Sequence, residues 1–100
     1  KRKAYKQAPS KEKFMQIITN IPPEKYFYVS DGSVIKNLSE LPDALRNMSP
    51  EAFNSHVNIE KNDFYNWIRD VFELSSLARK VKGVKRKETM AKKVFMEIFL

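Results

Sequence analysis

The chain has 100 residues, of which 42% are hydrophobic and 31% charged, a size and apolar content that fit one small folded domain. It contains no cysteine and a single histidine, which excludes disulfides, thiolate metal sites, a cysteine nucleophile and a histidine metal cluster. Cysteine-free chains are compatible with a reducing cytoplasm, and no apolar run approaches the roughly 18 residues of a membrane span. We therefore expect a cytoplasmic protein with no metal, cofactor or membrane contact.

The net charge of +7 is concentrated at the two ends of the chain. Residues 1–13 carry six basic and one acidic side chain, and residues 78–100 carry eight basic and two acidic side chains. Residues 14–77 carry five basic and nine acidic side chains, so the middle of the chain is mildly acidic. Because like charges are gathered despite their repulsion, this asymmetry indicates association through the ends of the chain.

Residues 1–9 show no hydrophobic period and end at Pro9, so we expect them to form a flexible basic arm. We expect residues 10–100 to form a single helical domain. Its first helix is predicted from a stripe at helical spacing, made of Phe14, Ile17, Ile18 and Ile21. A pair of prolines follows this stripe and ends the helix.

A short β-hairpin is predicted near residues 26–36. Aromatic and β-branched residues flank Asp31-Gly32, a pair that supplies the positive φ angles of a tight turn. Two strands alone are only marginally stable, so the hairpin must pack on a helix.

Two short helices are predicted after the hairpin. The first follows the capping candidate Ser39 and has the helical stripe Leu41, Ala44, Leu45 and Met48. The second begins at Ser49-Pro50, which are residue types suited to the N-cap and to the first helical position.

The strongest amphipathic pattern begins at Asn62 or Asp63, either of which can cap a helix. Its predicted buried face is Phe64, Trp67, Ile68, Val71 and Phe72. Helix or turn continues to the breaker Gly83, and a last helix is expected from Lys85. The apolar side of that helix comprises Met90, Ala91, Val94, Phe95, Ile98 and Phe99. These elements predict a mainly α fold, a small helical domain with one short β-hairpin.

A series of short motifs runs through residues 27–78. They read HV at 56–57, NDF at 62–64, WI at 67–68, VF at 71–72 and LA at 77–78. With the hairpin-like start, this pattern resembles an uncharacterised family of small archaeal and bacterial proteins, known only as a domain of unknown function. The resemblance implies a small helical domain and an archaeal source. It implies no activity and no functional residue.

His56 is the one side chain that titrates near neutral pH, and it has two interpretations. It could act as a general base, or it could be a half-buried histidine whose ring nitrogens bond nearby backbone or Asp63. We favour the structural interpretation, because no nucleophile motif accompanies the histidine. The acidic residues lack the spacing of a calcium loop, and we expect them to cap helices or to lie in solvent; they are Glu51, Glu60, Asp63, Asp70 and Glu73.

The basic ends carry the best functional signal, because each phosphate that a cation neutralises releases counterions. The candidate nucleic-acid-binding residues on the arm are Lys1, Arg2, Lys3 and Lys6. Those near the C-terminus are Arg79, Lys80, Lys82, Lys85, Arg86, Lys87, Lys92 and Lys93. Candidates for stacking on unpaired bases are Tyr5, Tyr26 and Tyr28. The alternatives are a solvated charged surface and tyrosines that pack under the first helix.

The sequence thus favours a non-enzymatic binding protein that associates with structured RNA, such as ribosomal RNA, or with ribosomal proteins. Lysines outnumber arginines at the ends, which favours contacts to the phosphate backbone over base reading. DNA binding by backbone contacts is a close alternative. A further alternative is a protein-interaction or regulatory module, which would dock through the apolar residues of its last helix. Those residues are Phe95, Ile98, Phe99 and Leu100.

Overall fold

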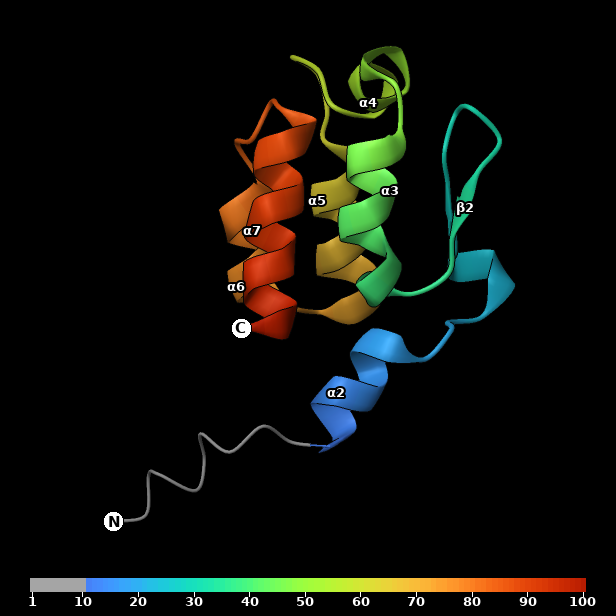
Figure 1. Cartoon of the computed structure of the whole chain (residues 1–100), viewed down its shortest axis with the longest axis vertical. Coiled ribbons are helices and arrows are strands. Elements are labelled where there is room, and N and C mark those ends of the chain that lie inside the picture. Colours follow the sequence, from blue (N-terminus) through green and yellow to red (C-terminus); the bar gives the residue numbers. More distant parts are fainter. Residues whose placement is uncertain (1–10) are drawn as a thin grey trace.

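The computed structural model describes residues 11–100, and in that range the fold is mainly α, as the sequence predicts (Figure 1). This part of the chain forms six α-helices and one two-stranded antiparallel hairpin. The helices are α2 (Lys11–Ile18), α3 (Leu41–Asn47), α4 (Pro50–His56), α5 (Asp63–Trp67), α6 (Ser75–Val81) and α7 (Lys87–Phe99). The expected arm at residues 1–9 lies outside the described residues.

The helices form two layers around one core. Helices α3 and α7 pack side by side in the front layer of Figure 1, and α5 and α6 lie behind them. The largest fully buried side chains come from both layers and from α4, and include Leu45, Phe53, Phe64, Leu77 and Met90. No helix between residues 11 and 100 has the length and apolar character that crossing a bilayer requires.

The hairpin consists of β1 (Phe27–Tyr28) and β2 (Val34–Ile35), with Phe27 opposite Ile35. Its turn confirms the prediction in part, because Gly32 has a positive φ of 96° whereas Asp31 does not. The hairpin packs on the helices through Phe27, whose ring stacks on Phe64 at a centroid distance of 4.4 Å.

Side-chain caps start several helices, and two of them are the predicted ones. Ser49 accepts a hydrogen bond from the backbone N–H of Ala52 at the start of α4, and Asn62 caps α5. The prediction for Ser39 is wrong, since Asn37 caps the short 3₁₀ turn η2 (Leu38–Glu40), from which α3 continues. Asn37 is only 6% exposed, and its side-chain oxygen accepts a hydrogen bond from the backbone N–H of Glu40 (3.1 Å).

The predicted stripe on α2 is mostly solvent-exposed. Only Ile17 is buried, whereas Phe14 is 51% and Ile18 is 38% exposed. Helix α2 extends away from the two layers in Figure 1, and its Gln16 amide donates to the carbonyl oxygen of Phe72 (3.2 Å). The predicted helix is therefore present, and Ile17 is the one side chain of its stripe that is buried in the core.

The predicted helix over residues 63–72 changes its geometry half-way. After α5 the chain continues as the π-helical segment η3 (Ile68–Phe72), which leaves Val71 only partly buried. Glu73 then adopts a left-handed conformation with φ of 57°. This residue separates η3 from α6, so the predicted continuation towards Gly83 is a distinct helix.

Candidate nucleic-acid interface

Two turns at one end of the domain are tied together. The turn at residues 58–61 links α4 to α5, and the turn at residues 82–86 links α6 to α7. The side-chain amide of Asn62 donates to the carbonyl oxygens of Val81 (3.0 Å) and Lys82 (3.1 Å). The two turns therefore present one continuous surface, which lies at the upper end of the molecule in Figure 1.

Four exposed cations lie on or beside these turns, and we call them the basic end: Lys61, Lys82, Lys85 and Arg86. The Lys85 ammonium lies 3.5 Å from the carbonyl oxygen of Asn58, which connects the two turns a second time. The Lys61 ammonium lies 3.0 Å from a carboxylate oxygen of Asp63. Sequence reasoning missed Lys61, because nothing local to it indicates that turn 58–61 lies against the basic turn 82–86.

A tyrosine extends the basic end towards α5. The guanidinium of Arg69 lies 5.0 Å and the ammonium of Lys82 lies 5.5 Å from the ring centroid of Tyr65. Such distances allow cation–π attraction, which orders the two long side chains. The Arg69 guanidinium also donates to Asp70 (2.7 Å), and this hydrogen bond holds the pKa of the Asp70 carboxyl below its usual range.

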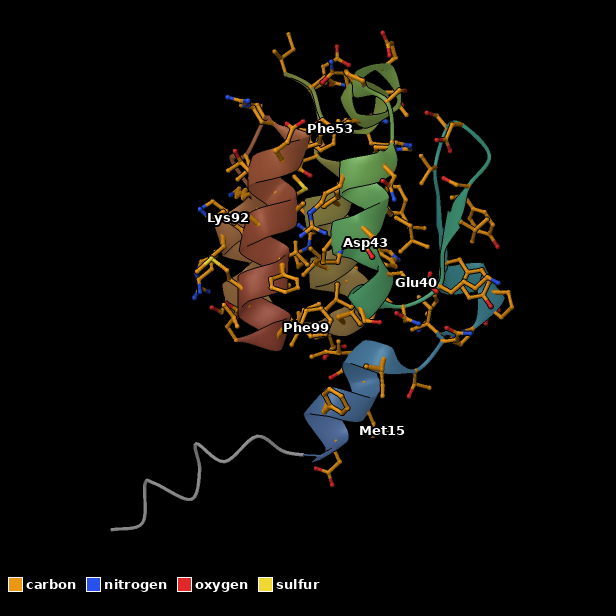
Figure 2. All side chains as sticks on the ribbon, in the orientation of Figure 1. Met15, Glu40, Asp43, Phe53, Lys92 and Phe99 are labelled. Carbon is orange, nitrogen blue, oxygen red and sulfur yellow. The ribbon has the colours of Figure 1, made fainter. Side chains whose placement is uncertain are left out.

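Three further predicted cations continue along the outer surface of α6 and α7. Arg79, Lys92 and Lys93 are exposed and make no ion pair with another side chain described in residues 11–100. Figure 2 labels Lys92 on the left side of α7, where it projects away from α3. Lys80 instead pairs with Glu97 across the two helices at 2.7 Å. The positive surface is therefore broader than the turns alone.

Lys87 has a structural contact that the sequence does not reveal. Its ammonium donates to the backbone carbonyl oxygen of Arg46 in the last turn of α3 (2.9 Å), and its side chain is only 15% exposed. Lys87 therefore ties α7 to α3, and we leave it out of the contact surface. Glu88 follows Lys87 in the chain. The carboxylate of Glu88 accepts a hydrogen bond from the backbone N–H of Glu88 itself, and this bond keeps the pKa of the carboxyl below its usual range. Glu88 thus places one negative charge in the first turn of α7.

The predicted stacking tyrosines lie elsewhere on the molecule. Tyr28 is 58% exposed and its hydroxyl donates to the carbonyl oxygen of Pro23 (2.7 Å). Tyr26 is partly buried, with its ring centroid 6.2 Å from that of Tyr28. Tyr28 belongs to β1 and Tyr26 directly precedes it, so neither side chain lies at the basic end. The other candidates fall outside the described residues; they are Lys1, Arg2, Lys3, Tyr5 and Lys6.

His56 is held as the structural interpretation predicts. Its Nδ1 lies 2.9 Å from Oδ2 of Asp63, and its Nε2 accepts a hydrogen bond from the backbone N–H of Ser30 (3.0 Å). An accepting Nε2 requires the proton of the neutral ring to be on Nδ1, which then donates to Asp63. Both nitrogens are thus occupied in joining the hairpin, α4 and α5.

The outer side of α7 exposes some of the residues that the sequence analysis assigned to the apolar face of the last helix. Met90, Ala91 and Val94 are buried, but Phe95 is 39% and Phe99 is 44% exposed. The two phenylalanine rings lie 5.1 Å apart. Figure 2 labels Phe99 near the end of α7, at the same end of the molecule as α2. The described part of the chain thus has a basic end and, opposite to it, an apolar end.

Comparisons with protein-family models, curated proteins and solved structures find no match for this chain. The resemblance to the domain-of-unknown-function family therefore stays a prediction. Within residues 11–100 no group of three or more His, Cys, Asp or Glu side chains could hold a metal ion.

Proposed function

We propose that this protein binds structured RNA in the cytoplasm, such as ribosomal RNA, through phosphate contacts from the basic end. The observation that carries this proposal is the joining of turns 58–61 and 82–86, which gathers four exposed cations on one surface. Because these cations stand on turns whose backbone is already held in place, binding costs little backbone freedom and more of the electrostatic gain is kept. The proposal treats the protein as a binding protein and not as an enzyme.

The outer surface of α6 and α7 supports contacts over more than one phosphate. Arg79, Lys92 and Lys93 extend the positive surface from the turns along both helices. Lysine ammoniums act as point charges and favour phosphate over base-edge recognition. The arm cations predicted at residues 1–6 would add further phosphate contacts to the same RNA.

The experiment measures binding of a fluorescent RNA hairpin with a stem of about 20 base pairs, using anisotropy from about 0.05 to 0.2 M salt. We expect the logarithm of Kd to rise linearly with the logarithm of salt concentration. The double variant Lys85→Gln/Arg86→Gln removes two cations of the basic end. It should weaken binding and reduce the salt slope by about two, since each lost phosphate contact releases one counterion fewer.

The matched control is Lys25→Gln/Lys36→Gln, which also removes two exposed cations but lies outside the basic end. Equal losses in both double variants would contradict a localised site and indicate binding by net charge alone. Failure of the hairpin to bind at about 0.05 M salt would contradict the proposed function. Duplex DNA of the same sequence separates the RNA proposal from its DNA alternative, and tighter DNA binding would favour the latter.

A second candidate function is docking of a protein partner, such as a ribosomal protein, on the outer side of α7. It is favoured by the exposure of the neighbouring rings of Phe95 and Phe99, whose apolar area is left in water. Arg46 lies over the Phe95 ring at 5.8 Å and would border such a contact. Phe99→Asp should abolish capture of the partner and leave RNA affinity unchanged. A monodisperse protein that captures the same proteins with and without this substitution would contradict docking.

A further inference from the structure

Ile59 is the most exposed large hydrophobic side chain in the described chain, at 97% exposure. It lies at the tip of turn 58–61, between α4 and α5. Turn positions normally hold Gly, Asn, Asp, Ser or Pro, because these residues satisfy turn geometry or hydrogen-bond the local backbone. A β-branched side chain offers neither advantage, and this one packs on nothing within the domain. Its presence there is not explained by the fold.

The backbone that carries Ile59 is held in place by several hydrogen bonds. The backbone N–H of Asn58 donates to the carbonyl oxygen of Lys61 (2.9 Å), and the Asn58 side-chain oxygen accepts from the N–H of Glu60 (3.0 Å). The Asn58 side-chain amide also donates to the carbonyl oxygen of Asn54 in α4 (3.2 Å). The turn is therefore preorganised, and Ile59 can contact a partner with little loss of backbone entropy.

The surroundings of this apolar tip are basic. Lys61 belongs to the same turn, and the Lys85 ammonium reaches the carbonyl oxygen of Asn58 directly before the tip. Glu60 is the one acidic side chain within turn 58–61. Cations that hold a phosphate backbone would bring the same nucleic acid against Ile59.

We propose that Ile59 is the apolar contact of the basic end and packs against the face of an unstacked base in the bound RNA. This inference rests on the proposed function. The major groove of a paired RNA helix is too deep and narrow for side chains to read, whereas a bulge or helix end displays bases whose faces are open. In complexes with duplex DNA, apolar side chains such as isoleucine insert between base steps, which shows that an aliphatic side chain can pack on the face of a base. The lysines fix the backbone, and Ile59 selects RNA with an exposed base.

The test compares two RNA hairpins with the same stem, one of which carries a single-nucleotide bulge. Ile59→Ser removes the apolar contact without touching the core or any charge. It should weaken binding of the bulged hairpin by about fivefold to tenfold, as expected for partial burial of one isoleucine side chain. The salt slope should stay the same, and the fully paired hairpin should be nearly unaffected. Leu100→Ser, at a site that is 85% exposed outside the basic end, is the matched control.

The outcomes separate this inference from the proposed function. If Lys85→Gln/Arg86→Gln weakens binding and Ile59→Ser leaves both affinities unchanged, RNA binding stands and the base contact is wrong. Equal losses on the bulged and the paired hairpin would also overturn it, since the contact would not depend on an open base. Absence of RNA binding by the wild type overturns the proposed function, and this inference with it.

Discussion

The side-chain amide of Asn62, at the start of α5, donates a hydrogen bond of 3.0 Å to the carbonyl oxygen of Val81, the last residue of α6. Its side-chain oxygen accepts from the backbone N–H of Tyr65 (3.0 Å). One asparagine therefore satisfies a free backbone N–H at the beginning of one helix and binds two carbonyl oxygens at the end of another. This double cap positions the two turns that carry the basic end.

Two substitutions of Asn62 should measure separately the contributions of its bond to α5 and of its bonds to α6 to the free energy of unfolding. Asn62→Ser keeps a side-chain oxygen for the α5 cap but cannot reach α6, and we expect a loss of about 1 kcal/mol in the free energy of unfolding. Asn62→Ala removes both caps and should cost about 2 kcal/mol. Urea denaturation measures both values. Equal stability of the serine and alanine variants would contradict a contribution from the contact to Val81.

Trp67 should make a large contribution to stability, because it is buried and its indole N–H donates to the carbonyl oxygen of Lys25 (2.8 Å). Trp67→Ala should lower the free energy of unfolding by about 3–5 kcal/mol through the cavity it leaves. Trp67→Phe keeps most of the ring but leaves the Lys25 carbonyl without its donor, for a cost of about 1–2 kcal/mol. Chemical denaturation measures the free energy of unfolding of both variants, and the alanine variant should be the less stable. A loss below about 1 kcal/mol for Trp67→Ala would show that Trp67 does not belong to the core.

The features that the sequence predicts correctly here are local ones. Ser49 and Asn62 cap helices because the hydroxyl or amide reaches a backbone N–H three residues away, and that distance is set within one turn. The hairpin turn is also predicted locally, because Gly32 adopts the positive φ angle that the turn needs. The sequence offers nearby backbone or Asp63 as partners of His56, and the structure shows one bond of each kind.

The features that the sequence does not reveal depend on packing between distant segments. The stripe of α2 has the right period, but the pattern says nothing about how much of the helix meets the core, and Phe14 remains in solvent. Likewise, Lys85 lies beside Asn58 because α6 returns the chain to the end of α4. No local pattern contains this contact, so neither Lys61 nor Ile59 could be assigned to the candidate site.

Glu73 offers a test of the junction between η3 and α6. Its left-handed conformation, with φ of 57°, is unfavourable for residues that have a side chain and ordinary for glycine. We expect Glu73→Gly to raise the free energy of unfolding by about 0.5–1 kcal/mol and Glu73→Val to lower it by about 1 kcal/mol. Thermal unfolding of the three proteins checks this order. If Glu73→Gly instead lowers the free energy of unfolding, the glutamate side chain stabilises the junction by more than the left-handed backbone conformation destabilises it.

Asp31 should make the stability of the hairpin turn dependent on acidic pH. Its carboxylate accepts hydrogen bonds from the Ser33 hydroxyl (2.7 Å) and backbone N–H (2.9 Å), and these bonds hold the pKa of the Asp31 carboxyl below its usual value. Because the pKa is lower in the folded than in the unfolded protein, the stabilisation is complete above the unfolded pKa of about 3.9. It is lost as the pH falls through the pKa of the folded protein.

The stability difference between wild type and Asp31→Ala, measured by urea denaturation, should therefore be constant near neutral pH and shrink below about pH 4. Asp31→Asn is the matched control, since its neutral side-chain oxygen accepts hydrogen bonds without titrating and its difference from alanine should stay constant. A wild-type difference that persists unchanged to about pH 2.5 would contradict a role for the ionised carboxylate in this turn.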